Sequence, residues 1–241
     1  MFEKGSLLHE GKAKRVFSVD QRDDLIWLDF KDDLTAFNAE KKGTFEGKGQ
    51  TNLEITEIIF GELKKNKIPT HWLEKISNKD LIVKKLKMIP LEVIVRNVLA
   101  GSTAKKFGIE EGAPLKTPLF ELFYKDDALA DPFMNSEQAL MMNCVKDISE
   151  IEMLKTQAFK INDVLLNMFK DIGVNLIDFK IEFGWSNDGV LCLGDEISPD
   201  SCRLWDLKTN EKLDKDRFRR DLGNVKESYE DILKRLKTKY S

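Results

Sequence analysis

Residues 176–184 read LIDFKIEFG, a regular alternation that strongly limits the local structure. Four apolar side chains alternate with three charged ones: Ile177, Phe179, Ile181 and Phe183 against Asp178, Lys180 and Glu182. Because successive side chains of a strand point to opposite faces, the segment predicts a strand with one apolar face and one charged face. Two interpretations of the charged face remain open: a binding site, or a solvent-facing strand whose charges compensate one another.

The residues that follow, WSNDGVLCLGDEISPD, predict that this strand turns back on itself. The Asp-Gly pair at 188–189 is typical of a two-residue hairpin loop, which would set Glu182 directly opposite Asp195. A four-residue loop would also leave both acids on one face, whereas a three-residue loop would separate them. Opposed carboxylates repel one another unless a cation lies between them, and Mg²⁺ is the candidate because it takes carboxylate, phosphate and water oxygens.

The whole chain has 241 residues, 41% of them hydrophobic, enough for one large domain or two smaller ones that share a cleft. A formal net charge of −3 gives no overall field for nucleic acid or an anionic membrane, so any phosphate binding is local. No signal peptide or membrane span is evident, and we expect a cytoplasmic protein. Cys144, Cys192 and Cys202 lack metal-ligand spacing, and His9 and His71 are too few for a zinc site or a histidine triad.

Hydrophobic periodicity divides the chain into two parts. The first is rich in strands, predicted at 6–11, 14–19, 25–30, 81–86 and 91–99, with a hairpin connection at 21–24 and one helix at 52–65. From about Gly101 the pattern is more helical, with helices predicted at 102–106, 136–145, 149–173 and 215–239. Ser149 and Glu152 fit a capping box for the longest helix, and Gly173 fits its C-terminal stop. We therefore expect two closely packed lobes.

Two further segments could bind anions. In GKAKRVF, residues 11–17, a glycine turn with Lys12 and Lys14 could cover a phosphate, although a basic surface hairpin is the simpler interpretation. In IPLEVIVRNVLAGSTAKKFG, residues 89–108, Arg96 and Ser102 could grip an anion at the start of a helix. The alternative makes Ser102 an ordinary N-cap and Arg96 an ion-pair partner.

Polar residues near the end of the predicted hairpin and in a predicted loop complete the set. Arg203 stands between Asp200 and Asp206 in the sequence, as either a structural ion-pair hub or a ligand for a phosphate or carboxylate. Lys125 and Asp131 lie in a Pro-containing segment, LFYKDDALADP, where we expect a loop.

The ordered set of motifs is similar to the SAICAR synthetase family over essentially the whole chain. The matching segments are GKAKRVF, VKKLKMIP, IPLEVIVRNVLAGS, LFYKDDALADP, LIDFKIEFG, GDEISPDSCRLWD and DKDRFRRDLG. The resemblance implies an ATP-dependent ligase of purine biosynthesis that joins carboxyaminoimidazole ribonucleotide (CAIR) to L-aspartate through an acyl phosphate, giving SAICAR, ADP and phosphate. It also implies a two-lobed α+β or α/β fold, distantly similar to protein kinases and ATP-grasp enzymes, and a homodimer. The N-terminal antiparallel β lobe with its helix would span residues 1–88, and the larger α/β lobe residues 89–241.

The resemblance assigns residues to ATP and Mg²⁺. The hairpin that covers the phosphates would contribute Lys12, Ala13 and Lys14. The segment between the lobes, against which adenine rests, would contribute Lys84, Lys85, Leu86 and Met88. Mg²⁺ and the nucleotide would be held by Glu182 and Asp195.

It also assigns residues to the chemistry and to the second substrate. The catalytic group would comprise Lys180, Asp178 and Lys125, with Lys180 near the transferring phosphoryl group. The ribonucleotide would be held by Arg96, Ser102 and Arg203 at its 5′-phosphate, with Asp131 in the surround. The segment 32–49 matches the family more variably, and no residue is assigned there to L-aspartate.

Two other functions are weighed against this one. A small-molecule kinase on the same scaffold would use the same nucleotide residues. A nucleic-acid-binding module is disfavoured because the basic residues are dispersed and no recognisable motif is present.

Overall fold

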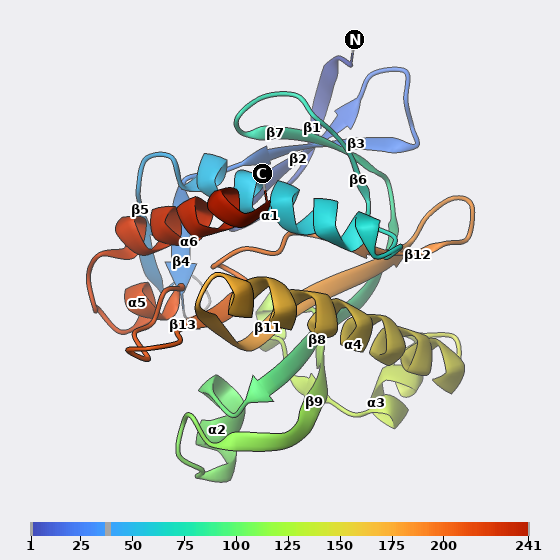
Figure 1. Ribbon diagram of the computed structural model, residues 1–241. Helices are drawn as coiled ribbons and strands as arrows, with labels where there is room; N and C mark the ends of the chain where they lie inside the picture. Colours follow the sequence, from blue (N-terminus) through green and yellow to red (C-terminus); the bar gives the residue numbers. More distant parts are fainter. Residues whose placement is uncertain (1, 37–39, 241) are drawn as a thin grey trace.

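The computed structural model describes residues 2–36 and 40–240, and a five-stranded antiparallel sheet forms its N-terminal part (Figure 1). In spatial order the strands are β1 (Lys4–Glu10), β2 (Lys14–Val19), β3 (Leu25–Phe30), β7 (Asp80–Lys84) and β6 (Trp72–Lys75). These elements confirm the strands predicted at 6–11, 14–19, 25–30 and 81–86. Leu28, Phe30 and Val83 on one face of this sheet pack against Leu53 of the first helix.

A second, six-stranded antiparallel sheet forms the centre of the larger lobe. Its order is β10 (Phe133–Met134), β9 (Pro114–Tyr124), β8 (Lys87–Val98), β11 (Val174–Trp185) and β12 (Leu191–Gly194), and β13 (Cys202–Asp206) also pairs with β11. A separate two-stranded ribbon consists of β4 (Asp33–Ala36) and β5 (Lys41–Thr44). The alternating strand predicted at 176–184 is therefore an interior strand, paired on both sides.

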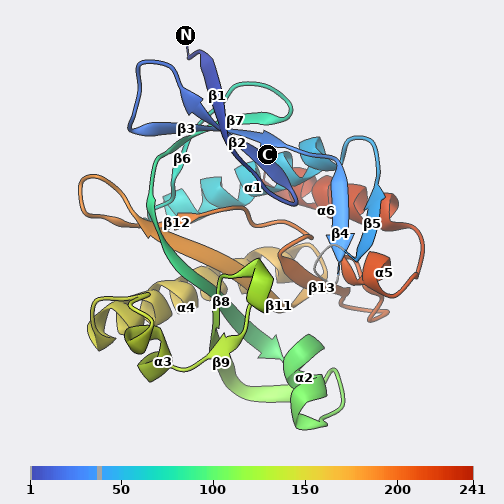
Figure 2. The ribbon, with the colours of Figure 1, turned by 180° about the vertical axis from the view of Figure 1, so that it is seen from behind.

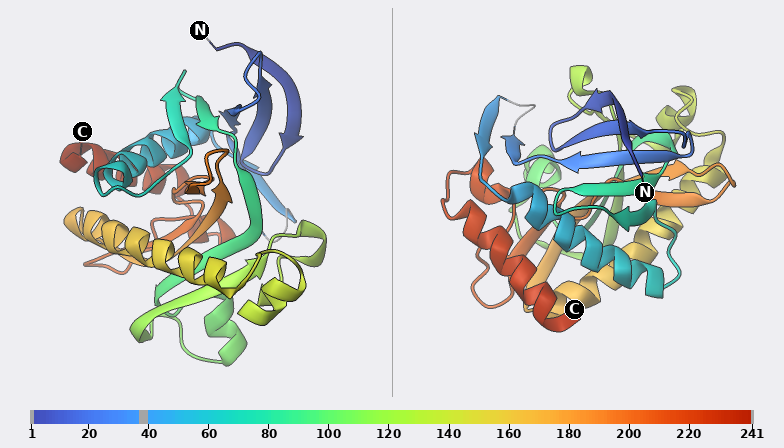
Figure 3. Two further views of the ribbon diagram at one scale, coloured as in Figure 1. Left: turned by 90° about the vertical axis from the view of Figure 1, so that its right-hand side faces the viewer. Right: turned by 90° about the horizontal axis from the view of Figure 1, so that it is seen from above.

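Three long helices lie on the same side of β8 and β11 (Figure 3). They are α1 (Lys48–Lys65), α4 (Ile148–Asp171) and α6 (Val225–Tyr240). Shorter helices are α2 (Gly101–Phe107), α3 (Ser136–Met141), α5 (Asp216–Arg219) and the 3₁₀ turn η1 (Asp127–Leu129). The two-lobed, mixed α and β fold that the motifs predicted is confirmed.

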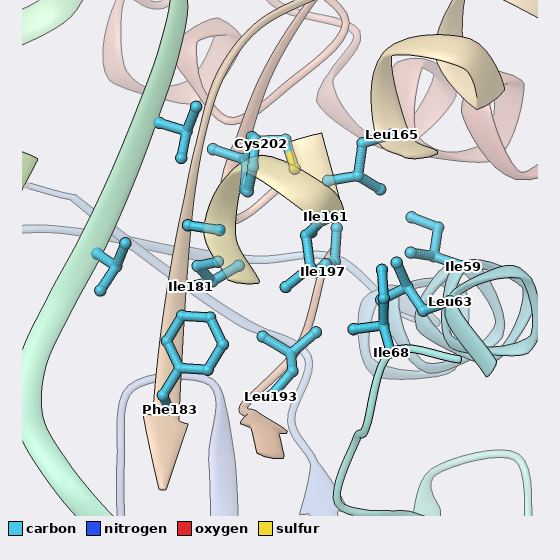
Figure 4. Close-up of a cluster of buried hydrophobic side chains, with 14 of the residues drawn as sticks. Ile59, Leu63, Ile68, Ile161, Leu165, Ile181, Phe183, Leu193, Ile197 and Cys202 are labelled. Carbon is cyan, nitrogen blue, oxygen red and sulfur yellow. The ribbon is translucent and has the colours of Figure 1, made fainter. Parts of the chain in front are cut away.

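The main hydrophobic core fills the space between the large sheet and these helices (Figure 4). Ile181 and Phe183 of β11 share this cluster with Ile161 and Leu165 of α4, and all four are buried. Because side chains alternate along a strand, the charged residues of β11 face away from the helices. The burial of one face thus determines which face is left for function.

Of the two ends predicted for the longest helix, the N-terminal one differs from the structure. The N-cap of α4 is Asp147, whose carboxylate accepts a hydrogen bond from the Glu150 amide, so the capping box predicted at Ser149 is wrong. Ser149 lies inside the first turn and donates its hydroxyl to Asp147, which is the stronger cap because it is charged. Gly173 follows the end of α4 with φ of 73°, as predicted.

The single helix predicted at 215–239 is two helices, and the one predicted at 136–145 ends at Met141. Asp221, Gly223 and Asn224, between α5 and α6, all have left-handed backbones, which a continuous α-helix excludes. Within residues 2–36 and 40–240, no helix is long and apolar enough to cross a membrane.

Candidate active site

A cleft of about 370 Å³ opens on the side of β8 and β11 opposite the three long helices. Figure 2 shows this side, where the β1–β2 hairpin and β4 stand above β8 and β11. Lining residues come from the hairpin, β4, β8, α2, β11, the segment after β12, β13 and the region of α5. Residues from both lobes therefore share one cleft.

The floor of the cleft is built from facing pairs on β8 and β11. Antiparallel pairing sets three residues of one strand against three of the other: Arg96 with Asp178, Ile94 with Lys180, and Glu92 with Glu182. Asp178 and Glu182 are each only 3% exposed, and Glu182 lies beneath Lys180 rather than among the residues that line the cleft. The interpretation of the charged face as a solvent-facing strand is therefore wrong, since it is a buried floor.

Lys180 is the centre of the charged cluster at one end of this floor. Its Nζ lies 2.8 Å from Glu182 Oε1, 3.2 Å from Asp195 Oδ2 and 3.3 Å from Glu92 Oε1. Burial disfavours the ammonium charge, but the surrounding carboxylates outweigh it and raise the pKa of Lys180 well above its ordinary value. The lysine therefore stays protonated and brings the carboxylates together.

The register predicted for the β11–β12 hairpin is wrong. Glu182 pairs with Gly194, not with Asp195, because the loop has three residues, 187–189. Ser186 closes it: its amide donates to the Val190 carbonyl and its hydroxyl accepts from the Val190 amide, while Gly189 has φ of 75°. A turn followed by a left-handed residue is the usual geometry of a three-residue hairpin loop.

Glu182 and Asp195 nevertheless lie close together. Asp195 follows the last residue of β12 and has a left-handed backbone, φ 57°, so the strand alternation no longer fixes its side chain. Each carboxylate contacts Lys180, and their oxygens are therefore separated by no more than the sum of those two contacts.

Two more lysines complete the cluster. Lys14, from the β1–β2 hairpin, is ion-paired with Asp195 and lies 3.2 Å from Glu196 Oε2. Lys125 is ion-paired with Glu182. Burial opposes the charge of Asp195, but Lys14 and Lys180 hold the pKa of this carboxyl well below its usual range. Lys14, Lys180 and Asp195 are thus held in their charged forms beside one another.

At the tip of the same hairpin, Lys12 and Ala13 also line the cleft. Lys12 Nζ lies 2.7 Å from Asp127 Oδ1, an exposed pair that joins the hairpin to η1 in the larger lobe. Asp131 lies just beyond η1 and accepts a hydrogen bond from the Asp126 amide at 3.0 Å. It is not among the residues that line the cleft.

Two arginines occupy the other end of the floor. Arg96 donates from Nε to Glu121 Oε2 at 2.7 Å and from Nη1 to Asp178 Oδ2 at 2.5 Å, and is 1% exposed. Arg203 donates to the same Asp178 at 3.0 Å and to Asp216 Oδ2 at 3.1 Å. Arg203 is an ion-pair hub, but its partners are not its sequence neighbours.

The expected partners Asp200 and Asp206 pair elsewhere. Asp206 contacts Arg235 at 3.0 Å, and Asp200 contacts Lys48. Asp206 lies three positions along β13 from Arg203, so its side chain points to the opposite face of the sheet, and Asp200 precedes the strand.

Ser102 lines the cleft beside these arginines. The N-cap of α2 is Ala100, without a side-chain cap, so the alternative of Ser102 as an N-cap is wrong. Gly101, between them, has φ of 64°, and a Cβ there would lie 2.5 Å from Arg203 Nη2. A glycine at this position lets the guanidinium pack directly against the start of the helix.

The segment predicted to rest against adenine does not line this cleft. Lys84 and Lys85 are exposed, and Lys84 lines a separate groove beside Trp72. Leu86 and Met88 lie directly over glycines 184 and 194, where a Cβ would come within 2.8 Å and 3.1 Å of them. Leu86 lies in the connection between β7 and β8, and Met88 lies at the start of β8.

Sequence reasoning missed several residues of the cleft. Glu92 lies two and four positions before Ile94 and Arg96, and strand alternation from Arg96 would have found it. Lys215 and Arg219 come from the predicted final helix, and no local pattern distinguishes them from a solvated face. Asp200 also lines the cleft, held from behind by the buried Lys48.

The residues present fit a magnesium–nucleotide site of low ligand number. In the described part of the chain, no cluster of three or more His, Cys, Asp or Glu side chains is arranged around a metal position. Glu182 and Asp195 offer two adjacent carboxylates, and Mg²⁺ commonly takes one or two protein carboxylates, with substrate phosphates and water as its remaining ligands.

Comparisons of sequence and of structure with known proteins lead to one family. A phosphoribosylaminoimidazole-succinocarboxamide synthase of Lachnoclostridium phytofermentans is 54% identical over 229 residues, 95% of this chain and 96% of the relative. The crystal structure of the synthase from Ehrlichia chaffeensis is 39% identical, with a TM-score of 0.93, over 96% of this chain and 98% of that one. A SAICAR synthetase in complex with ADP is 42% identical, with a TM-score of 0.92, over 99% of both chains. Since residues 7–236 also match the sequence profile of SAICAR synthetase, the chain belongs to the SAICAR synthetase family.

Proposed function

We propose that this chain is the ATP-dependent ligase that joins CAIR to L-aspartate, giving SAICAR, ADP and phosphate in de novo purine biosynthesis. The observation that carries the proposal is the floor of the cleft, where an arginine pair and an acid–lysine cluster lie at opposite ends of the same two strands. One end suits a substrate phosphate and the other a nucleotide polyphosphate. The family relationship supports the same reaction.

The nucleotide would lie at the acid–lysine end. Lys12, Ala13 and Lys14 of the hairpin would cover its phosphates, and Lys84, Lys85, Leu86 and Met88 would form the edge near adenine. Glu182 and Asp195 would hold Mg²⁺, which, when bound, neutralises phosphate charge and aligns the γ-phosphoryl group. The related ADP complex supports nucleotide use, and the acid pair supports the metal.

CAIR would lie with its 5′-phosphate between Arg96, Ser102 and Arg203. The carboxylates that already contact the arginines, Asp178 above all, fix the two guanidinium groups in place, so little side-chain entropy is lost on binding. Asp131 and Lys125 would belong to the surround of the reacting carboxylate. In this orientation the imidazole ring would extend along β8 toward Lys180, which pairs with Ile94, two positions before Arg96.

The reaction needs activation of a carboxylate, because a carboxylate is a poor acylating agent. Its oxygen attacks the γ-phosphorus of ATP, ADP leaves, and an acyl phosphate forms. The aspartate amine then attacks the acyl carbon and loses a proton, the C–N bond forms, and phosphate leaves with the former carboxylate oxygen. Lys180, and Lys14 beside it, would neutralise the phosphoryl group during the first step, and Asp178 would hold the substrate end rigid.

The proposal also covers the role of each lobe and the oligomeric state. Residues 1–88 would form the lobe that covers the nucleotide, and residues 89–241 the lobe that holds the metal, CAIR and L-aspartate. We also propose a cytoplasmic homodimer. No residue is assigned to L-aspartate, and residues 37–39 of the segment 32–49 lie outside the described residues.

An omission assay tests the function. ADP release is coupled to a spectroscopic readout, and ATP, Mg²⁺, CAIR and L-aspartate are left out in turn. The proposal expects stoichiometric ADP release only when all four are present. ADP release that needs no aspartate, with phosphorylation of a hydroxyl group, would show a small-molecule kinase instead.

A further inference from the structure

The unusual feature of the acid–lysine cluster is the backbone of Asp195. The odd-numbered hairpin loop places Gly194 opposite Glu182, and Asp195, which contacts Lys14 and Lys180, has a left-handed backbone. Few residues with a side chain adopt the left-handed region, although aspartate does so more readily than most. Contacts from elsewhere in the fold can favour this conformation over the alternatives.

His71 provides such a contact. Its Nε2 lies 3.1 Å from the backbone carbonyl oxygen of Asp195, although 124 positions separate the two residues. The approach is fixed by backbone bonds to β12: the His71 amide donates to the Leu193 carbonyl at 2.9 Å, and the Leu193 amide donates to the Pro69 carbonyl at 2.9 Å. The segment 69–71 thus lies beside the end of β12.

The hydrogen bond has a defined direction. A carbonyl oxygen can only accept, so the proton of the imidazole must be on Nε2. The side chain is 5% exposed and packs near the ring of Phe60 at a centroid distance of 6.0 Å. Burial, with a smaller contribution from the charge of Lys14, lowers the pKa of His71 to about 4, so the ring is neutral at pH 7.

We propose that His71 is a positioning residue for Asp195. Its Nε2–H donates to the Asp195 carbonyl and holds the left-handed backbone, so that the carboxylate points toward Lys14 and Lys180 and is available to the metal–nucleotide. The inference rests on the proposed function for the identity of that ligand. His71 itself touches neither nucleotide nor substrate and acts only through Asp195.

A matched pair of variants tests the hydrogen bond. Glutamine and methionine have similar length and shape, but only glutamine keeps an N–H donor at the end of the side chain. We expect the affinity for ADP, measured by calorimetry with Mg²⁺ and with EDTA, to respond differently in the two variants. In His71→Met, the factor by which Mg²⁺ increases the affinity for ADP should fall about tenfold, while the affinity measured with EDTA stays unchanged. In His71→Gln, the same factor should stay within about threefold of the wild-type value.

Equal Mg²⁺ dependence in His71→Met and the wild type would overturn the inference, as would a loss in His71→Gln as large as that in His71→Met. Thermal melting checks that each variant folds, and His71→Leu replaces the Met variant if that one does not. In an Asp195→Asn background the His71 substitution should have no further effect on Mg²⁺ dependence. An effect as large as in the wild-type background would contradict action through Asp195.

A crystal structure of the same apolar variant gives a readout without metal. The inference expects Asp195 to leave the left-handed region or its carboxylate to leave Lys14, and an unchanged Asp195 would contradict it. This measurement separates two kinds of failure. If the affinity of the wild type for ADP does not depend on Mg²⁺, the proposed metal site is contradicted. If Asp195 keeps its conformation in the apolar variant, the role of His71 is contradicted.

Discussion

At the scale of single residues, the site depends on groups that share a partner. Lys180 contacts three carboxylates, and Asp178 accepts hydrogen bonds from two arginines. Charges that are buried and paired in this way are costly to remove singly, because each loss leaves the partners uncompensated. Substitutions that keep shape and remove charge are therefore the informative ones.

Glu182→Gln and Asp195→Asn should each lower kcat by about 100-fold or more while the fold persists. Asparagine tolerates the left-handed backbone of Asp195, so the second change removes charge with little strain. Steady-state kinetics at limiting Mg²⁺, with circular dichroism as the folding control, measure the effect. Wild-type activity in either variant under these conditions would remove the metal assignment.

Gly101→Ala should raise the KM for CAIR by about tenfold or more, because the added Cβ displaces the Arg203 guanidinium that lies 2.5 Å away. Gly108→Ala is the matched control at the other end of α2. It has the same φ of 64° with no atom within 4 Å, so it carries the same backbone strain of roughly 1–2 kcal/mol without the clash. An equal change of KM in both variants would show that Arg203 does not bind the ribonucleotide.

At the scale of elements, periodicity predicted most strands, α1, α2 and the long α4, since each buries one regular face. Loop length was harder to predict. The Asp-Gly pair correctly indicated a hairpin, but the side chain of Ser186 closes a three-residue loop, and one residue reverses every pairing. Partners distant in sequence, such as Arg203 and Asp216 or His71 and Asp195, left no local pattern. The sequence therefore indicated the residue types of the site better than their contacts.

Asp200 joins two helices behind the cleft and makes the stability sensitive to acid. It contacts Lys48 of α1, and its Oδ1 accepts a hydrogen bond from the Tyr229 hydroxyl of α6 at 2.8 Å. Burial opposes its charge, but Lys48 and then Lys215 hold the pKa of this carboxyl well below its ordinary 3.8. Its stabilising contribution is therefore present above pH about 4 and is lost as the pH falls further.

Asp200→Asn should lower the free energy of unfolding by about 3–5 kcal/mol at pH 6, because Lys48 is left buried without a counter-charge. The difference in free energy of unfolding between wild type and variant should shrink by about 1 kcal/mol at pH 3. At that pH the wild type has lost part of the stability that ionised Asp200 contributes. Urea unfolding at the two pH values measures both. A difference that stays constant or grows on acidification would contradict the assignment.

At the scale of the whole molecule, the position of the cleft follows from which face of the large sheet packs against the hydrophobic core. The long helices cover one face of the large sheet, and the other face, under the β1–β2 hairpin, carries the charged residues of β8 and β11. Lys14–Asp195 and Lys12–Asp127 connect the hairpin to the larger lobe across this opening. Nucleotide phosphates bound there would contact both lobes at once.

Transfer of an oxygen atom tests the central claim most directly. CAIR labelled with oxygen-18 in its carboxylate is incubated with ATP, Mg²⁺ and L-aspartate, and the phosphate released is examined by mass spectrometry. An acyl phosphate mechanism predicts one oxygen-18 atom in each phosphate formed, in step with SAICAR. Unlabelled phosphate alongside SAICAR would contradict the proposed activation of the carboxylate.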